Sequence, residues 1–479
     1  MPAHTDPSGS PGIPGKLRLA DAAALALGAI ALFIALTGGR RYVVFGAVVA
    51  LRSPLLFVYA GVSVLIVRHL LWPRPSAIEH LSAVRASIRA RPDAAAALSA
   101  FLATRPAVLA VGFFAVITFG TVAPPGSTLS NDPLANLPAR FDAGWYGDIA
   151  LNGYSWDRSF QRQRNIAFFP ALPLLMRPAG AVFGMYERTA PRDRRMLRGM
   201  WAGVVISLSA FLWALHYLVR LGRGLVGGEA AAHAALLLAA YPFAVFFGAP
   251  YTESLYLLGA VGAFYHFTRH EWVPAAAWGL LLGLARPNGC FASLPLAILA
   301  VQQLRAAPGP RPVSAVAMRL LTAATPVIGM LLFTAYLYGL TGVEFAWARS
   351  HLAWGRAYEG AAPFVRAFDW LREAPLMEVL ASAPYNTLNG VAVLFALALT
   401  YPVFRRLGAA WGVFVLVNLV PPLVAGGVLS MGRLTSTLFP LFLVLPLLIP
   451  ARAVPAWAAV FGLGQGLCAA LFFTWRQLF

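Results

Sequence analysis

Apolar segments of about 18–23 residues recur along almost the whole chain, and each is long enough to cross the ~30 Å hydrocarbon core of a bilayer as a helix. Hydrophobic residues make up 59% of the 479 residues and charged residues only 11%, whereas roughly 25% charged is usual in a soluble domain. The pattern predicts an all-α polytopic membrane protein with about 12–14 transmembrane helices. It excludes a soluble enzyme, a coiled coil and a nucleic-acid-binding protein.

The net charge of +19 fits loops at a membrane surface better than a nucleic-acid partner. Lys16 is the only lysine, and the arginines are scattered through short loops rather than gathered in one patch. Such loops orient a membrane protein and contact anionic lipid head groups. Cys290 and Cys468 lie in apolar runs, which gives neither a disulfide framework nor zinc-ligand spacing. We therefore expect membrane lipids as partners, no nucleic acid and no metal. The Arg-rich and Ala-rich usage is typical of a GC-rich bacterial genome.

The candidate spans follow one another with short connections. They lie near residues 20–38, 53–72, 105–123, 166–184, 197–219, 230–248, 251–269, 273–286, 289–304, 318–340, 386–404, 408–426, 434–450 and 454–475. The first apolar run is long enough to remain as an anchor, so no removable signal peptide is expected. We find no internal repeat, which weakens a transporter built from duplicated halves.

Basic residues predict the orientation, with one conflict. Residues 73–104 carry more arginine than acid, which is typical of a cytoplasmic loop, so residues 124–165 would lie outside. If 166–184 crosses the membrane, the arginines of 188–198 are cytoplasmic and those of every later loop are outside. If it lies along the surface, the arginines of 188–198 are outside and those of every later loop are cytoplasmic. Its three prolines favour a broken interfacial segment, and with it about thirteen true spans. The outer face would then carry residues 124–165, 248–253, 341–385 and Gly432–Arg433.

The first long outer loop concentrates carboxylates and aromatic residues. If residues 142–151 form a helix, Asp142 and Tyr146 share a face and Asp148 lies on another. One face of the helix would then carry a single carboxylate, that of Asp142, beside Tyr146. The two carboxylates would not act as a pair. A structural interpretation is also open, in which Asp142 is a solvated helix N-cap and Trp145 and Tyr146 are interfacial anchors.

Four motifs, in order along the chain, carry a resemblance to a known family. They read FDAGWY at 141–146 with AFFPALPLL at 167–175, PFAVFFGAPYTESL at 242–255, ARPNG at 285–289, and SMGR at 430–433 before FPLF at 439–442. This set resembles the PIG-V-like mannosyltransferases, which are related to the second mannosyltransferase of GPI-anchor synthesis, and their bacterial homologues. The family usually has Trp before the aspartate, where this chain has Phe141, so an aromatic residue is kept.

The resemblance implies a GT-C-like architecture with a large catalytic first extracytoplasmic loop. It implies a hexosyltransferase that moves mannose from polyprenyl-phosphate-mannose to a hydroxyl of a lipid-linked glycan, glycolipid or protein, with inversion, at the outer face of a bacterial cytoplasmic membrane. The lipid-phosphate sugar is a substrate, and no cofactor is expected. The expected domains are a disordered segment 1–15, an extension 16–104 with two transmembrane helices and a cytoplasmic basic loop, a glycosyltransferase core 105–450, and a C-terminal transmembrane helix 451–479.

The same resemblance assigns roles to site residues. The attacking hydroxyl needs a base, and an extracytoplasmic aspartate fills that role, so Asp142 is the first candidate and Asp148 the second. The leaving phosphate needs cations, and the forked guanidinium of arginine matches phosphate oxygens. Arg286 and Arg433, each beside the end of a span, are the candidates for that task.

The remaining substrate-binding candidates have structural alternatives. Glu253, beside Tyr251, either orients an acceptor hydroxyl or pairs with an arginine. The segment at 351–356 resembles a platform for a sugar or a head group, with interfacial anchoring as its alternative. Arg286 could also be a simple span-end anchor before a chain break. The candidates in this group are Tyr146, Tyr251, Glu253, Asn288, His351, Trp354 and Arg356.

Two other functions remain open from the sequence. A lipid or lipid-linked-sugar transporter, or flippase, would line its path with mid-membrane polar residues and tolerate Asp142→Asn. A non-catalytic scaffold would tolerate changes at Asp142 and Arg433. Among the acidic residues only Asp21 and Glu253 border apolar spans, which argues against ion-coupled transport. The sequence therefore favours the enzyme.

Overall fold

The computed structural model is almost entirely helical, which confirms the all-α prediction. It describes residues 15–38, 40–44, 47–51, 53–306, 309, 312–356, 358, 360–362, 365, 368–369, 372 and 375–478. One antiparallel pair of strands is the exception, β1 (Arg40–Val44) and β2 (Ala47–Leu51). The segment 1–15, expected to be disordered, lies outside the described residues apart from Gly15.

Contacts divide the chain into two compact units, residues 1–95 and 96–479. The first contains the strands, α1 (Gly15–Thr37), α2 (Pro54–Leu71) and α3 (Ala77–Arg89). The buried carboxylate of Asp21 accepts a hydrogen bond from Arg68 Nε at 3.0 Å, and His80 Nδ1 lies 2.7 Å from its other oxygen. The acidic residue at the first apolar run is therefore an ion-pair partner that joins all three helices.

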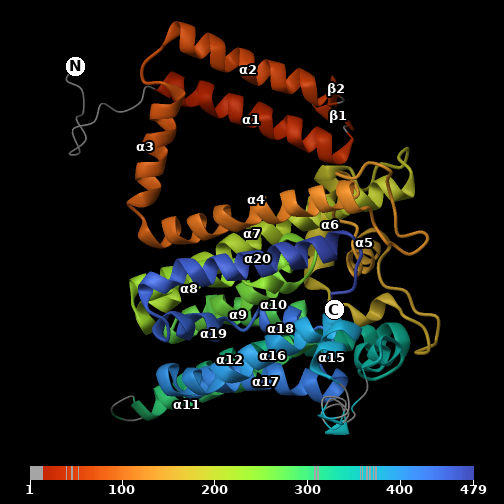
Figure 1. The fold of residues 1–479 in the computed structure, drawn as a ribbon, viewed down its shortest axis with the longest axis vertical. Helices are drawn as coiled ribbons and strands as arrows, with labels where there is room; N and C mark the ends of the chain where they lie inside the picture. Colours follow the sequence, from red (N-terminus) through yellow and green to blue (C-terminus); the bar gives the residue numbers. More distant parts are fainter. Residues whose placement is uncertain are drawn as a thin grey trace. The chain divides into compact units, whose positions relative to one another are not determined.

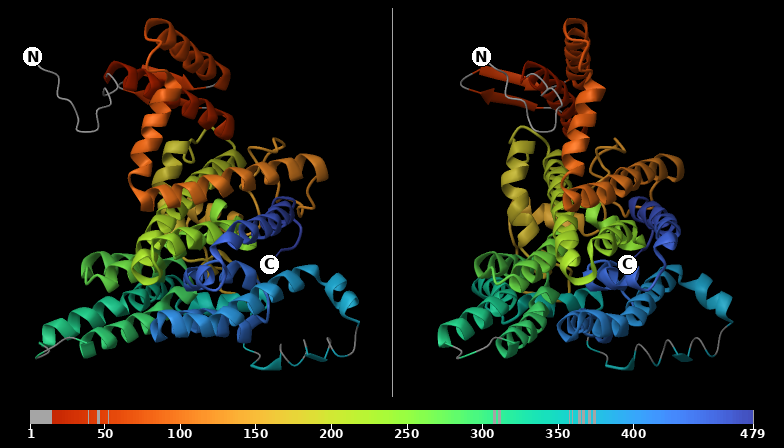
Figure 2. Two further views of the ribbon diagram at one scale, coloured as in Figure 1. Left: turned by 60° about the vertical axis from the view of Figure 1, so that its left-hand side comes forward. Right: turned by 90° about the vertical axis from the view of Figure 1, so that its left-hand side faces the viewer.

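The second unit is a bundle of long helices with shorter helices between them (Figure 1). Its elements are α4 (Pro92–Phe119), α5 (Ala143–Asn152), η1 (Asn165–Ala167), α6 (Ala171–Phe183), α7 (Arg192–Val226), α8 (Gly228–Ala240), η2 (Pro242–Gly248), α9 (Glu253–Thr268), α10 (Trp272–Ala285), η3 (Pro287–Ala292), α11 (Ser293–Ala306), α12 (Val313–Thr341), α13 (Ala346–Ser350), η4 (His351–Trp354), α15 (Leu376–Ser382), α16 (Pro384–Leu407), α17 (Ala409–Gly426), α18 (Met431–Thr435), α19 (Phe439–Val444), η5 (Leu445–Leu447), η6 (Ala451–Ala453) and α20 (Val454–Phe473). Helices α16 and α17 pack side by side, as both views of Figure 2 show.

Within the described residues, nine helices are long and apolar enough to cross a membrane, or ten if the bent pair α8 and η2 forms one span. The chain is therefore a multi-pass membrane protein. The number is smaller than the 12–14 spans expected, because several apolar runs form shorter helices. Helix α9 has 16 residues and α10 has 14. At 1.5 Å per residue these helices extend about 24 and 21 Å, less than the ~30 Å hydrocarbon core.

Helices α8 and α9 form a hairpin that begins and ends at the same end of the bundle. α8 starts directly after α7, across Gly227. α9 returns to the C-terminal end of α7, where His266 Nε2 lies 2.9 Å from the Tyr217 hydroxyl oxygen. The chain turns at η2, where Pro242 cannot continue the hydrogen bonding of α8. The expected spans 230–248 and 251–269 are thus the two arms of one hairpin.

Helices α10 and α11 form a second hairpin of the same kind. α10 starts beside the end of α9, and near the end of α11 the Gln303 amide donates to the carbonyl oxygen of Phe267 at 3.2 Å. Helix α12 also starts there, with the Arg319 guanidinium 5.1 Å from the centre of the Trp272 ring. Pro287 marks the turn, in η3. Each hairpin begins and ends at the same end of the bundle, so the sidedness of all later loops is the same as with the four expected spans.

A buried arginine and a glutamine donate hydrogen bonds to carbonyl groups around the break between α8 and η2. Arg105, at the middle of α4, donates to the carbonyl oxygens of Ala244 at 2.6 Å and Ala239 at 2.7 Å. Gln465 of α20 donates to Ala239 and Tyr241 at 2.9 Å. Unbonded carbonyl groups are costly inside a bilayer. These side chains therefore allow the chain to turn within the helical layer.

Helix α6 corresponds to the expected segment 166–184 and has 13 residues. At 1.5 Å per residue it extends about 20 Å, which is too short to cross. It packs with α5 and α7 near one end of the bundle (Figure 1). Its length supports the surface interpretation of this segment.

The surface interpretation leaves the five arginines of residues 188–198 on the same side as α5, and the structure gives three of them local partners. Arg198 Nη1 lies 2.6 Å from Glu187 Oε2, and Arg192 Nη2 lies 3.3 Å from Asp148 Oδ1. Arg195 Nε donates to the carbonyl oxygen of Met185 at 2.9 Å. Because local partners bind these cations, the segment is a weak exception to the rule that basic loops are cytoplasmic.

Candidate active site

Asp142 stands at the N-terminus of α5, but its side chain does not cap that helix. The preceding residue, Phe141, has φ of 46°, in the left-handed region that non-glycine residues rarely occupy. Its ring packs 4.5 Å from that of Trp475 and 5.8 Å from that of Phe472, measured between ring centres. Contact with the end of α20 thus explains why an aromatic residue precedes the aspartate, and the turn directs Asp142 away from the helix axis.

Tyr251 fixes the backbone on both sides of this turn. Its hydroxyl group accepts a hydrogen bond from the Asp142 amide at 3.0 Å and donates to the Arg140 carbonyl oxygen at 3.1 Å. Tyr251 is fully buried and is the residue before Thr252, whose hydroxyl oxygen lies 3.3 Å from that of Tyr146. The first and second motifs are therefore joined by two tyrosine hydroxyl groups.

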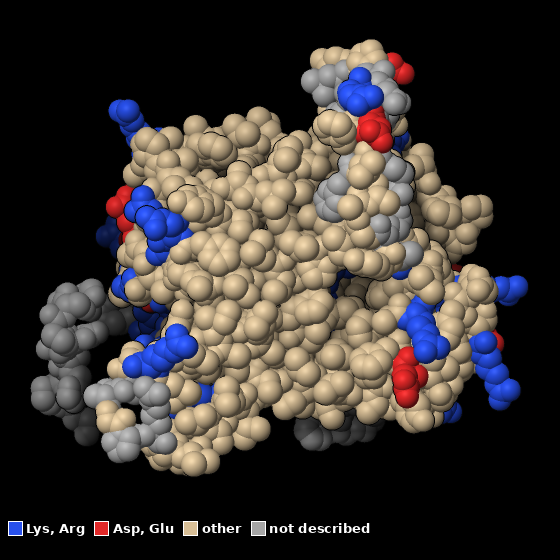
Figure 3. All heavy atoms as spheres, turned by 90° about the horizontal axis from the view of Figure 1, so that it is seen from below, with Lys and Arg blue, Asp and Glu red and all other residues tan. Residues whose placement is uncertain are grey.

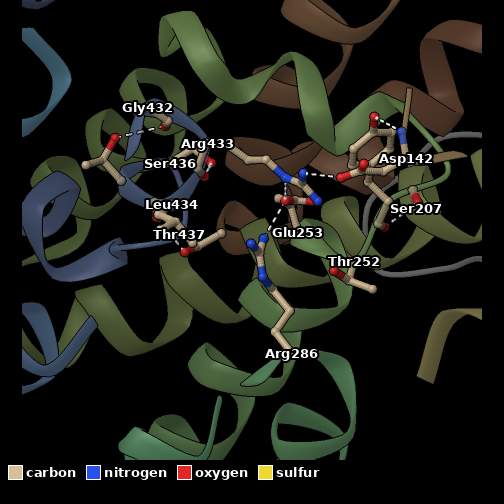
Figure 4. A network of polar contacts seen from close by, with 12 residues as sticks. Asp142, Ser207, Thr252, Glu253, Arg286, Gly432, Arg433, Leu434, Ser436 and Thr437 are labelled. Carbon is tan, nitrogen blue, oxygen red and sulfur yellow. Dashed lines mark hydrogen bonds and ion pairs between the residues drawn. The ribbon is translucent and has the colours of Figure 1, made fainter. Parts of the chain in front are cut away.

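Arg433 joins three of the four motifs through its guanidinium (Figure 4). Its Nη1 donates to Asp142 Oδ2 at 2.7 Å, and its Nε donates to Glu253 Oε1. The same Glu253 oxygen accepts from Arg286 Nη1. The guanidinium also lies over the Tyr251 ring, 4.5 Å from its centre. A fully buried carboxylate therefore separates two arginines and holds both.

The motif around Arg433 brings its backbone unusually close to η2. A Cβ on Gly432 would lie 2.2 Å from the ring of Phe243, so only glycine fits there. The Gly432 amide donates to Asn389 Oδ1 at 2.8 Å. This close packing explains the glycine before Arg433.

Asp142, Arg286 and Arg433 face a cavity of about 530 Å³. One wall comes from the Asp142 loop and η1, another from η3, a third from the segment 347–356 and the last from the end of α17 and α18. The lining residues include Asp142, Tyr146, Phe168, Arg286, Asn288, Cys290, Phe291, His351, Trp354, Arg356, Pro421, Pro422, Ala425, Leu429 and Arg433.

The cavity is rich in positive charge. Burial, followed by the charges of Arg286 and Arg433, lowers the pKa of Arg356 to about 10. Burial, followed by the charges of Arg356 and Arg286, lowers the pKa of His351 to about 4. His351 is therefore neutral at pH 7. Three arginines face two carboxylates, Asp142 and Glu253, so the cavity retains an excess positive charge that suits an anionic ligand.

Aromatic rings gather beside the Asp142 loop. The ring of Trp145 stacks on Phe168, 5.7 Å between centres, and Trp354 meets both edge-on at 5.9 and 5.6 Å. Burial raises the pKa of Tyr146 to about 12, so its hydroxyl group remains protonated and can donate or accept a hydrogen bond. Flat rings of this kind can pack against the apolar face of a sugar.

The structure brings most of the predicted site residues together. Those that line the cavity are Asp142, Tyr146, Arg286, Asn288, His351, Trp354, Arg356 and Arg433. Tyr251 and Glu253 are buried behind the wall, where they hold the backbone and the arginines. Pairing with arginine, one of the two alternatives for Glu253, is what the structure shows.

Asp148, the second candidate for the base, lies elsewhere. Its carboxylate accepts hydrogen bonds from Asn152 at 2.8 Å and from Asn165 at 3.1 Å, and it pairs with Arg192. It does not line the cavity. The side chains of Asp142, at the N-terminus of α5, and of Asp148 therefore lie on different faces of this helix, as the helical periodicity predicted.

Several residues that build the site were not among those predicted. Arg140 is buried and donates to the carbonyl oxygens of Phe473 at 2.6 Å and Asn136 at 2.7 Å. Asn288 Nδ2 donates to Asn418 Oδ1 at 3.0 Å, which joins η3 to α17. An amide such as Asn418 inside an apolar run was the available signal, because a polar side chain there needs a partner. No group of three or more His, Cys, Asp or Glu that could hold a metal ion occurs among the described residues.

The family model described as Mannosyltransferase (PIG-V) matches residues 123–349. This segment contains Asp142, Glu253 and Arg286, and Arg433 lies beyond it. The match confirms the resemblance for the motifs at 141–175, 242–255 and 285–289. No curated protein matches this chain in sequence.

Two of the similar solved structures are crystal structures of the Archaeoglobus fulgidus oligosaccharyltransferase. The one with Zn and sulfate is 15% identical, with a TM-score of 0.37, over 77% of this chain and 53% of that one. The one tethered to an acceptor peptide containing the NVT sequon is 14% identical, with a TM-score of 0.36, over 78% of this chain and 55% of that one. This chain thus spans about half the length of these two proteins.

Proposed function

We propose that the protein transfers mannose from polyprenyl-phosphate-mannose to an acceptor hydroxyl group, because residues 123–349 match the family model described as Mannosyltransferase (PIG-V). The observation that carries the proposal is the placement of Asp142. Its carboxylate is held by Arg433 at 2.7 Å on the wall of a cavity that also contains Arg286 and Arg356. A carboxylate that could act as a base and arginines that could bind a phosphate thus share one cavity.

Asp142 is the base in this proposal. Arg433 binds Oδ2 and fixes the orientation of the carboxylate, and Oδ1 accepts no hydrogen bond from another described residue. Oδ1 can therefore take the proton of the acceptor hydroxyl group as the hydroxyl oxygen attacks the anomeric carbon. Because the carboxylate is fixed before the reaction, it needs no reorganisation at the transition state.

Arg286 and Arg356 stabilise the leaving group. When the bond between the anomeric carbon and the phosphate oxygen breaks, its electron pair remains on the phosphate, which gains negative charge. Arg286 keeps free N–H groups after it binds Glu253, and among the described residues the Arg356 guanidinium donates to the Leu429 carbonyl oxygen alone, at 3.3 Å. Neutralisation of the developing charge by guanidinium groups lowers the barrier. A single displacement of this kind inverts the anomeric centre.

The charges of the loops support an extracytoplasmic site. Arg405 and Arg406 end α16, and Trp411 at the start of α17 packs 5.0 Å from Phe264, toward the end of α9. Arg305 ends α11 at the same end of the bundle. Basic loops favour the cytoplasmic side. The Asp142 loop belongs to the opposite end, where donor and acceptor would be bound.

The experiment is sugar transfer by the purified protein in lipid, with radiolabelled polyprenyl-phosphate-mannose and a host membrane extract as acceptor source. We expect transfer from the lipid donor, none from GDP-mannose, and a product with the opposite anomeric configuration to the donor. Movement of the labelled lipid across vesicles without transfer would favour the transporter. Absence of both binding and transfer would reject the lipid-phosphate donor.

A further inference from the structure

Asn288 is the one amide side chain among the described residues that line the cavity, and only one end of this amide is bound to the protein. Its Nδ2 donates to Asn418 Oδ1 at 3.0 Å. Its Oδ1 accepts no hydrogen bond from a described residue, and it is not one of their fully buried atoms without a partner. Because Asn288 lines the cavity, the accessible oxygen of its amide faces that space.

The orientation of this amide follows from a chain of hydrogen bonds behind the cavity wall. Asn418 Nδ2 donates to the Phe414 carbonyl oxygen at 2.9 Å, and because a carbonyl oxygen can only accept, the other end of the Asn418 amide must be its oxygen. That oxygen accepts from the Tyr256 hydroxyl group at 2.7 Å and from Asn288 Nδ2. Reversing either amide would place two acceptors against each other. Asn288 Oδ1 is therefore directed away from Asn418.

Helix α9 holds the ARPNG motif at two points. Glu253 binds Arg286, and Tyr256, one turn later on the same helix, binds Asn418, which in turn holds Asn288. Glu253, Tyr256 and Asn418 are all buried, so water does not compete for these contacts. The arginine and the amide oxygen are thus presented to the cavity in a fixed relative position.

The two groups bind different chemistry. Arg286 is a charged donor, which suits a phosphate oxygen. The Asn288 carbonyl oxygen only accepts, so it repels a phosphate oxygen and needs a ligand group that donates. Figure 3 shows a hollow in a face made mostly of uncharged residues, with Lys or Arg atoms inside it. Near such cations a neutral hydroxyl group is favoured as the donor over an ammonium group.

We propose that Asn288 Oδ1 accepts a hydrogen bond from a hydroxyl group of the transferred sugar, and that Asn418 and Tyr256 are positioning residues that fix this oxygen. The inference rests on the proposed function, in which the phosphate at Arg286 carries the sugar. Two residues of extended chain span at most about 7 Å, which is close to the width of a hexose, so a sugar on that phosphate reaches the amide. The amide then selects for a sugar that has a hydroxyl group at this position.

The test combines donors that lack one hydroxyl group with variants that lack the amide. In lipid nanodiscs, with the membrane extract as acceptor source, we would measure kcat/KM for polyprenyl-phosphate-mannose and for its monodeoxy analogues. We expect the wild type to prefer mannose over one analogue by about 10- to 100-fold, because that analogue leaves a buried acceptor unpaired. In Asn288→Ala this preference should fall below about twofold. Comparing preferences between variants cancels the intrinsic reactivity of each sugar.

The positioning residues are tested by Asn418→Leu and Tyr256→Phe, which keep the approximate size of each side chain and interrupt the hydrogen-bond chain. We expect both to lower the same preference by about threefold or more and to leave the preferences over the other analogues unchanged. A purely structural role would not single out one hydroxyl group. Tyr256→Phe keeps the ring packed, so it tests the chain even if Asn418→Leu fails to fold. Tyr265→Phe, toward the other end of α9, should match the wild type.

The other outcomes overturn the inference in distinguishable ways. If transfer continues in Asn288→Ala and no preference changes, the amide oxygen does not bind the donor sugar, while the proposed function stands. A raised KM for the acceptor alone would assign this oxygen to the acceptor. A preference lost in Asn288→Ala but kept in both Asn418→Leu and Tyr256→Phe would remove the positioning role. Failure of both donor binding and transfer in the wild type would reject the proposed function itself.

Discussion

Arg433 Nη1 lies 2.7 Å from Asp142 Oδ2, and this contact joins side chains that are 291 positions apart in the sequence. The same guanidinium holds Glu253 through Nε. Because Glu253 also holds Arg286, the position of the Asp142 carboxylate on the cavity wall is tied to the position of the Arg286 guanidinium in the same cavity. The proposed base, Asp142, and the proposed phosphate-binding residue, Arg286, are therefore parts of one network.

Replacing Asp142 with asparagine should abolish most of the transfer. The amide keeps the size of the side chain but cannot take a proton, and removal of a general base typically costs about 10²- to 10⁴-fold in rate. We expect the donor to bind with little change, since Arg286 and Arg356 remain. The measurement is transfer rate together with equilibrium donor binding in lipid.

The matched control is Asp148→Asn, because Asp148 lies on the same helix and does not line the cavity. It should transfer at nearly the wild-type rate. Transfer that survives in Asp142→Asn and fails in Asp148→Asn would move the base to Asp148.

Replacing Arg433 with lysine should lower kcat even though the charge is kept. Arginine binds the two carboxylates through different nitrogen atoms, whereas a lysine ammonium is a single point charge that cannot reproduce this fork. We expect about a 100-fold loss of kcat from the misplaced base. Arg192→Lys, at an exposed arginine outside the cavity, should have no effect. Wild-type kcat in Arg433→Lys would mean that charge alone suffices.

The sequence predicted which side chains come together better than it predicted the path of the chain. The motifs identified Asp142, Glu253, Arg286 and Arg433 because their chemistry matches a known family, and the structure places these side chains in one network. The hairpins were missed because hydropathy measures how apolar a run is, and not whether it crosses or returns.

Arg105 is a single residue whose position in the fold hydropathy could not predict. The expected span began at Arg105, since an arginine is costly inside a bilayer and usually marks a boundary. The structure starts α4 at Pro92, which places Arg105 at its middle. Only the tertiary structure supplies the carbonyl groups that this side chain binds, so no local pattern could have predicted its burial.

Replacing Glu253 with glutamine should destabilise the protein. Glu253 is fully buried between Arg286 and Arg433, and removing its charge leaves two neighbouring cations without their shared partner. Breaking a buried ion pair in this way typically costs about 3–5 kcal/mol. Thermal unfolding in detergent checks the prediction, with Glu229→Gln as an exposed control in α8. An unchanged unfolding temperature would show that the arginines find other partners.

His351 should make stability depend on pH below neutrality. Burial and the nearby arginines lower its pKa from 6.5 to about 4, so between these values the unfolded chain binds a proton that the folded protein does not. Stability contributed by the neutral imidazole is present above pH 6.5 and falls as the pH drops toward 4, by about 1.4 kcal/mol per pH unit at most. Unfolding midpoints at pH 7 and 4.5 should differ less in His351→Gln than in the wild type. The exposed His69→Gln should behave as the wild type does.

Replacing Arg105 with leucine should destabilise the bundle although leucine is far more apolar. The change removes the donors that bind the Ala239 and Ala244 carbonyl oxygens at the break after α8. Gln465 still reaches Ala239, so one carbonyl group, that of Ala244, loses its side-chain donor, at a cost of about 1–3 kcal/mol. Arg405→Leu, at an exposed arginine of α16, should leave the unfolding temperature unchanged. If Arg105→Leu were as stable as Arg405→Leu, the turn at η2 would not depend on this arginine, and the position of Glu253 would have to be maintained by the packing of α9 alone.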